Sequence, residues 1–63
     1  GNQMKFIKIN RLNETCYFNP QKITKLFISD DIITIFFENE TLEIYKKECY
    51  NFDEIKKLIR EIL

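Results

Sequence analysis

The side chains of this sequence that could carry out covalent or metal chemistry are few. Its two cysteines, Cys16 and Cys49, lie 33 residues apart, which is not the clustered spacing of a four-ligand zinc site. There is no histidine, so the commonest general base and the commonest zinc ligand are missing. The only glycine is Gly1, which excludes a phosphate-binding loop and a dinucleotide fingerprint. We therefore expect no enzymatic activity, no metal and no cofactor.

The remaining reactive groups each have a simpler structural interpretation. A nucleophilic Cys16 would need a base such as Lys22 or Lys25, and nothing in the sequence requires that arrangement. Asp30 and Asp31 are too few ligands for calcium and suit a solvated turn. A disulfide between the cysteines would contribute roughly 3 to 4 kcal/mol, but we expect reduced thiols that pack as small apolar side chains.

The triplet Asn-Glu-Thr occurs twice, at Asn13 and at Asn39. Each matches the acceptor motif for N-glycosylation, which would imply a secreted protein. Asn in a hairpin turn, followed by Thr at the start of a strand, explains the same letters. Because the chain shows no signal-peptide pattern, we interpret both triplets as hairpin turns.

Basic residues provide one candidate binding surface. The basic residues that could gather at an edge or end of a sheet and contact nucleic acid through its phosphates are Arg11, Lys22, Lys25, Lys46 and Lys47. Interleaved Tyr17, Phe27 and Tyr45 could add stacking. Lysine near a sheet edge also protects that edge from pairing with other chains, which is the competing interpretation. The chain has ten basic and ten acidic residues, so no overall field favours an anionic partner.

Aromatic residues provide a second candidate surface. The chain has six Phe and three Tyr, too many to lie under one short helix. Phe36 and Phe37 are neighbours in a strand-like run, so their side chains face opposite sides of the sheet. One face would pack on a helix and the other would meet a partner protein or a second copy of the chain, unless the sheet curls enough to bury both. The candidate protein-binding residues are Tyr17, Phe27, Phe36 and Tyr45.

The elements that must position these residues fit one small domain. Residues 1–3 precede Met4 and look like a vector-derived scar, so we expect residues 4–63 to fold as a single α+β domain. No apolar run approaches the roughly 18 residues that span a bilayer. We therefore expect a cytoplasmic protein that makes no membrane contact.

Alternating apolar and polar residues predict an antiparallel meander of four to five strands, over residues 4–12, 15–19, 22–29, 32–38 and 41–46. The expected turns are Asn13-Glu14, Asp30-Asp31 and Asn39-Glu40, with Asn tolerating the left-handed conformation that a tight hairpin needs. Pro20 should end the second strand because it cannot donate to a sheet ladder. "IKINRLNETCYF" and "ITIFFENETLEIY" repeat at a spacing of 26, which predicts two similar hairpins in one sheet.

The last segment changes to the helical period and predicts a C-terminal amphipathic helix packed on one face of the sheet. Its apolar stripe comprises Phe52, Ile55, Leu58, Ile59, Ile62 and Leu63. We expect Asn51 to cap the helix, with Glu54 completing a capping box. Tyr50 and Ile55 occupy the positions of a hydrophobic staple.

The order of these segments resembles the FlbD-like family of small flagellar and regulatory proteins. The resemblance rests on "IKINRLNETCYFNPQKITKLF", on "ITIFFENETLEIYKKE" and on the helix "FDEIKKLI". It implies a non-enzymatic regulator that binds another protein, and it supplies no catalytic residues. From the two apolar faces we expect the partner to be another protein or a second copy of the chain in a homodimer. An inhibitor encoded by a phage or mobile element is a subtype of the same expectation.

A second segment, "CYFNPQKITKLFISDDIITIFFENETLEIYKKE", resembles the later half of a LytTR-type DNA-binding domain. In that family an Asn after the strand and basic residues after the final hairpin meet DNA. The resemblance implies that Asn19, Lys46 and Lys47 are the matching positions. The sequence thus favours a non-catalytic protein-binding regulator and leaves a nucleic-acid-binding module as the alternative.

Overall fold

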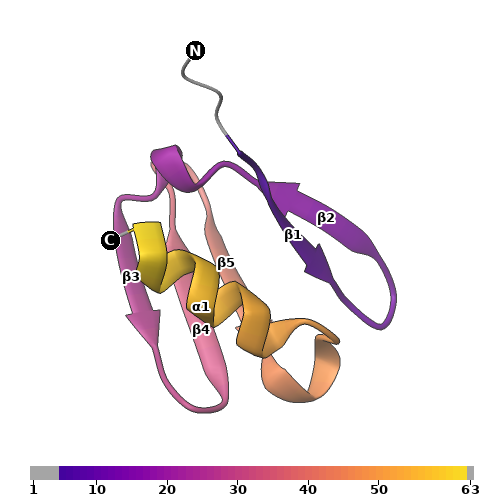
Figure 1. Cartoon of the computed structure of the whole chain (residues 1–63). Coiled ribbons are helices and arrows are strands. Elements are labelled where there is room, and N and C mark those ends of the chain that lie inside the picture. The colour runs from indigo at the N-terminus through magenta and orange to yellow at the C-terminus, as the bar shows by residue number, and fades with distance from the viewer. Residues whose placement is uncertain (1–4, 63) are drawn as a thin grey trace.

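The computed structural model describes residues 5–62, so the predicted scar at residues 1–3, Met4 and Leu63 lie outside the described part (Figure 1). The elements, in chain order, are β1 (Ile7–Asn10), β2 (Thr15–Phe18), the 3-10 helix η1 (Pro20–Lys22), β3 (Lys25–Ile28), β4 (Ile32–Phe36), β5 (Thr41–Tyr45), the 3-10 helix η2 (Lys46–Glu48) and α1 (Phe52–Ile62). The predicted α+β class, with antiparallel strands and a C-terminal helix, is confirmed. Over the described residues, no helix has the length and apolar character needed to cross a membrane.

The strands divide into two sheets, whereas the sequence predicted a single meander. β1 and β2 form a hairpin, and β3, β4 and β5 form a three-stranded antiparallel sheet. The break falls at η1, because Pro20 cannot donate to a ladder and the Asn19 side chain accepts a hydrogen bond from Gln21 N–H. The two repeats are hairpins, as predicted, but they lie in different sheets.

Two of the hairpin turns differ from the prediction by one residue. The N–H of Arg11 donates to the carbonyl of Glu14 at 2.9 Å, which places Leu12 and Asn13 at the tip of the first hairpin. The β4–β5 hairpin shows the same shift, and the β3–β4 turn falls at residues 30–31, as predicted. No described residue has a positive φ, so the asparagines turn the chain without the left-handed conformation predicted for them.

The outer edge of β1 is completed by residues 48–51 and not by a strand. Tyr50 N–H donates to the Asn10 carbonyl at 2.8 Å. The Asn51 side chain continues this pairing: Oδ1 accepts from Asn10 N–H, and Nδ2 donates to the Lys8 carbonyl, both at 2.9 Å. Among the described hydrogen bonds, this side chain makes none to the first turn of α1, so the predicted N-cap is wrong.

The core lies between α1 and the two sheets (Figure 1). Its buried residues are Ile7, Ile9, Phe18, Ile33, Ile35, Ile44, Cys49, Phe52, Ile55 and Ile59. The alternation predicted for the first strand is confirmed, because Ile7 and Ile9 are buried while Lys8 between them is exposed. Burial of these branched side chains in one cluster is the main source of the stability of the fold.

The apolar stripe of α1 is wider than the surface it covers. Leu58 and Ile62, predicted to face the sheet, are 36% and 54% exposed. A helix turns by about 100° per residue, so Leu58 lies to one side of the buried line through Ile55 and Ile59. The predicted staple is also wrong, because Tyr50 is 71% exposed.

Candidate protein-binding face

The outer face of the three-stranded sheet carries most of the aromatic residues predicted to bind protein. In β4, Ile33 and Ile35 are buried, so alternation turns the intervening side chains to the other side. β3 and β5 alternate in the same way. We call this surface the outer sheet face; its residues are Lys25, Phe27, Ile32, Thr34, Phe36, Thr41, Glu43 and Tyr45.

An aromatic pair occupies the β3 side of the outer sheet face. The rings of Phe27 and Phe36 meet edge to face, with centroids 5.9 Å apart and an interplanar angle of 76°. The Lys25 ammonium nitrogen lies 5.7 Å from the Phe27 centroid and 5.1 Å from the Phe36 centroid, which is a cation–π arrangement. Phe27 is nevertheless 57% exposed. An aromatic pair held in fixed geometry with open surface is typical of protein-binding sites.

A hydrogen-bonded tyrosine occupies the β5 side of the outer sheet face. Tyr45 lies opposite Ile32, and its hydroxyl donates to Glu43 Oε1 at 3.2 Å. This hydrogen bond, and then the negative charge of the same carboxylate, raise the pKa of Tyr45 above its ordinary value. The face therefore carries the positive charge of Lys25 on one side and the negative charge of Glu43 on the other.

The structure separates Tyr17 from the other three predicted protein-binding residues. Tyr17 lies on β2, opposite Lys8, in the two-stranded sheet. Ile32 and Thr34, which were not predicted, complete the outer sheet face. Counting in steps of two from Phe36 along β4 identifies both, because alternate residues of a strand share a face.

The lysines predicted to contact nucleic acid fall at opposite ends of the three-stranded sheet. Lys22 ends η1 and Lys25 begins β3, opposite the last residue of β4. Lys46 and Lys47 lie in η2, which follows β5 at the other end, where Lys46 N–H donates to the Asp31 carbonyl at 2.8 Å. The structure therefore divides these lysines into two pairs and does not bring them together.

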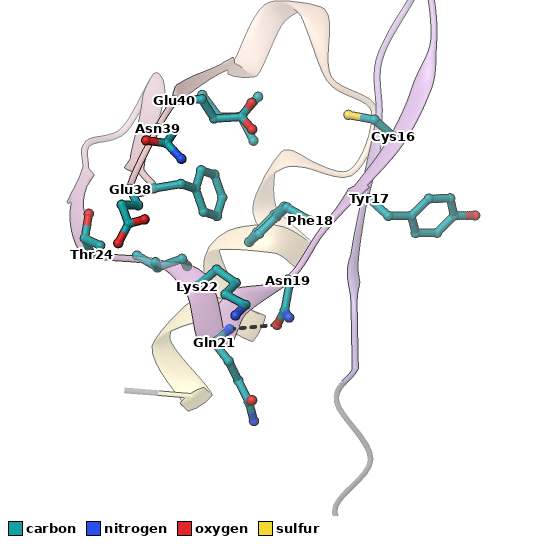
Figure 2. A pocket seen from close by; sticks show the side chains of 13 residues that line it. Cys16, Tyr17, Phe18, Asn19, Gln21, Lys22, Thr24, Glu38, Asn39 and Glu40 are labelled. Atoms are coloured by element: carbon teal, nitrogen blue, oxygen red, sulfur yellow. Dashed lines mark hydrogen bonds between the residues drawn. The ribbon is translucent and has the colours of Figure 1, made fainter.

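A groove of 730 Å³ lies between β2, η1 and the β4–β5 turn (Figure 2). The rings of Phe18 and Phe37 line it, and they meet edge to face with centroids 6.0 Å apart. Asn19, predicted as a DNA contact, lies at its margin, and its Oδ1 accepts from Gln21 N–H at 2.9 Å (Figure 2). This oxygen therefore has a structural role at the start of η1.

The titratable side chains that line the groove include Cys16, Lys22, Glu38 and Glu40. Figure 2 shows the Tyr17 ring directed away from the groove. Within residues 5–62, no group of three or more His, Cys, Asp or Glu side chains could hold a metal ion. Cys16 and Cys49 are not bridged, and the Cys49 thiol donates to Asn51 Oδ1 at 3.3 Å inside the fold.

Comparison of the chain with protein-family models, with curated proteins and with solved structures found no match. The FlbD-like and LytTR-type resemblances therefore stay predictions from the sequence. The outer sheet face is the surface that bears most directly on function.

Proposed function

We propose that this protein is a small non-catalytic regulator or inhibitor that binds another protein through the outer sheet face. The observation that carries the proposal is the aromatic pair of Phe27, which is exposed, and Phe36, which is half-buried, with Lys25 above both rings. The two-stranded sheet and α1 cover the opposite face, and within residues 5–62 no helix or strand lies over the outer sheet face.

The distribution of charge on this face suits a protein partner. Interfaces place apolar and uncharged groups at the centre and charged groups at the rim. Thr34 lies at the centre of the face, whereas Lys25 and Glu43 lie on its two outer strands. Binding that buries such a centre depends mainly on apolar contact, so we expect the affinity to change little with added salt.

The two cysteines refine the proposal. The free thiols of Cys16 and Cys49 suit a reducing compartment, so we place the protein in the cytoplasm. The proposal accommodates both an FlbD-like regulator and an inhibitor encoded by a phage or mobile element, because both act by occupying a protein surface.

The test is affinity capture from a lysate of the source cell, with and without nuclease, read by mass spectrometry. Thr34→Arg places a charge at the centre of the outer sheet face without touching the core. We expect the wild-type chain to capture a stoichiometric protein that resists nuclease. Thr34→Arg should reduce that capture by about tenfold or more, because an unpaired charge buried in an interface is costly.

Two matched variants make the outcome specific. Tyr17→Ser alters an exposed aromatic residue of the other sheet and should leave capture unchanged. Lys46→Glu combined with Lys47→Glu tests the nucleic-acid alternative, since phosphate contacts depend on such lysines and weaken steeply with salt. Capture that survives Thr34→Arg would contradict the proposal. So would capture that is lost on nuclease treatment or in the double variant of Lys46 and Lys47. Circular dichroism confirms that each variant is folded.

A further inference from the structure

One edge of β3 is paired and the other is open. β3 is the first strand in the order β3-β4-β5 and, among the described residues, pairs only with β4. Ser29 N–H donates to the Ile32 carbonyl, and hydrogen-bonded pairs alternate along an antiparallel ladder. Phe27 therefore directs its backbone groups toward β4, whereas Leu26 and Ile28 direct their N–H and C=O groups to the open edge.

The outer edges of β1 and β5 each have partners from other parts of the chain. Residues 48–51 complete the outer edge of β1. On the outer edge of β5, the Glu43 carbonyl accepts a hydrogen bond from Arg11 Nη2 at 2.8 Å. β3, with the sequence KLFI, contains no proline and has no comparable cover in the described part of the chain. An open apolar edge of this kind is a template for pairing with another strand.

We propose that the open edge of β3 pairs with β3 of a second copy of this chain, in antiparallel orientation about a twofold axis. The opposite charges at the two ends of β3 are the reason for choosing a second copy of β3 as the strand that pairs with this edge. β3 begins with Lys25 and leads into the acidic turn of Asp30 and Asp31. Antiparallel self-pairing brings each basic end to the acidic end of the other copy, whereas parallel pairing would join like charges.

One register uses all the open backbone groups of β3. Leu26 lies opposite Ile28 of the second copy, and each of these pairs exchanges both of its N–H···O bonds. Phe27 then lies opposite the Phe27 of the second copy, at a closely spaced position where side chains interact most. Lys25 lies opposite Ser29 of the second copy, beside the acidic turn.

β2 does not offer the same pairing. It also has an open edge, but its residues, TCYF, carry no charge, and the residues that flank it are Glu14 and Asn19. Antiparallel self-pairing of β2 would therefore bring no opposite charges together. Charge complementarity assigns the second copy to β3.

The dimer extends the outer sheet face. The row formed by Phe36 and Phe27 in one copy continues into Phe27 and Phe36 of the other, on a sheet twice as wide. The pairing goes beyond the proposed function and requires no other protein. Because it joins one short strand to another, it belongs to the small and weak class of interfaces, and we expect rapid exchange between monomer and dimer.

Sedimentation velocity of the purified full chain over a concentration series tests the dimer against the monomer mass of 7.7 kDa. Lys25→Asp and Asp30→Lys each place like charges across the pairing. We expect each to raise the dissociation constant by about tenfold, because every dimer contains two such exposed pairs. The double variant restores opposite charges between the copies and should restore the wild-type constant.

Restoration of dimer formation by the double variant has to come from contacts between the two copies. Lys25 and Asp30 of one chain are about 16 Å apart along an extended strand, farther than a Debye length at physiological salt. Lys57→Glu makes the same change in net charge as Lys25→Asp, but on the exposed side of α1, and should leave the dimer unchanged. A chain that stays monomeric at millimolar concentration, or a dimer that the double variant does not restore, would overturn the inference.

Amide hydrogen exchange locates the contact. The N–H groups of Leu26 and Ile28 should become protected as the concentration rises, whereas that of Tyr17, on the open edge of β2, should not. A dimer without this protection would use another surface and would also overturn the inference. Thr34→Arg should reduce capture of a partner by about tenfold or more yet leave the dimer intact, which distinguishes a failure of the dimer from a failure of the proposed function.

Discussion

Replacing Asn51 with alanine should lower the free energy of unfolding by about 2 kcal/mol, because two hydrogen bonds worth about 1 kcal/mol each are lost. Asn10 N–H donates to Oδ1 of Asn51, and Nδ2 of Asn51 donates to the Lys8 carbonyl, both at 2.9 Å. These bonds join residues 41 and 43 positions apart in the sequence. Alanine would leave two backbone groups of β1 without their partners.

This loss is large in relation to the stability of a chain of 63 residues. At about 0.05 to 0.15 kcal/mol per residue, the whole fold is stabilised by roughly 3 to 9 kcal/mol. A loss of about 2 kcal/mol corresponds to a fall in Tm of about 10 °C for a domain of this size. Urea denaturation followed by circular dichroism measures the free energy, and a thermal melt measures Tm.

Asn51→Ser separates pairing with β1 from helix capping. Serine caps a helix about as well as asparagine does, but its single hydroxyl cannot replace an amide that bonds two backbone groups. Serine should therefore destabilise the fold about as much as alanine does. The matched control Asn39→Ala, at the exposed β4–β5 turn, should change stability by less than about 0.5 kcal/mol. An Asn51→Ser protein as stable as the wild type would refute the role in pairing and restore the capping interpretation.

Two further predictions follow from the core and from the outer sheet face. Ile35 is fully buried, so Ile35→Ala should lower the free energy of unfolding, measured by urea denaturation, by about 2 to 5 kcal/mol. The control Thr41→Ala, at an exposed position, should leave it nearly unchanged. Similar losses of stability in both variants would contradict the assigned core. Glu43→Gln should lower the Tyr45 pKa toward its ordinary value of 10.0, because the charged acceptor is removed. Since folding raises the pKa of Tyr45, the stabilisation that the protonated hydroxyl gives is present below about pH 10 and is lost as pH rises through the pKa of the folded state. An NMR titration of the Tyr45 ring that is the same in Glu43→Gln and in the wild type would exclude Glu43 as the cause of the raised pKa.

The periodic parts of the fold could be predicted because their signals are local. The alternation of Ile7 and Ile9 with Lys8 indicates a strand with one buried face, whatever that face packs against. The spacing of Phe52, Ile55 and Ile59 indicates a helix in the same way, and all three are buried. Each pattern depends on backbone geometry within a few residues.

Features that depend on distant partners could not be predicted in this way. Asn51 satisfies the local rule for an N-cap, but the backbone of β1 supplies the partners of its side chain. The closure of the outer edge of β1 is a second example, because residues 48–51, which pair with it, come from a distant part of the chain. No pattern near β1 in the sequence indicates which distant segment completes that edge.

The candidate site was predictable to the extent that it lies in consecutive hairpins. Phe27, Phe36 and Tyr45 share a face because two short turns set the register of β3, β4 and β5. The position of Tyr17 relative to them depends on how one sheet lies against the other. Hydrophobic alternation carries no information on that arrangement.

The closure of β1 by residues 48–51 sets an order of assembly for the two sheets. β3, β4 and β5 are joined by short turns, and local pairs of this kind form fast. The outer edge of β1 finds its partner only when residues about 40 positions farther along the chain dock on it, which is a slower event because a long loop must close. The three-stranded sheet is therefore completed first. Until residues 48–51 dock, the hairpin of β1 and β2 keeps an unpaired strand edge exposed, and exposed edges of folding intermediates are prone to aggregation.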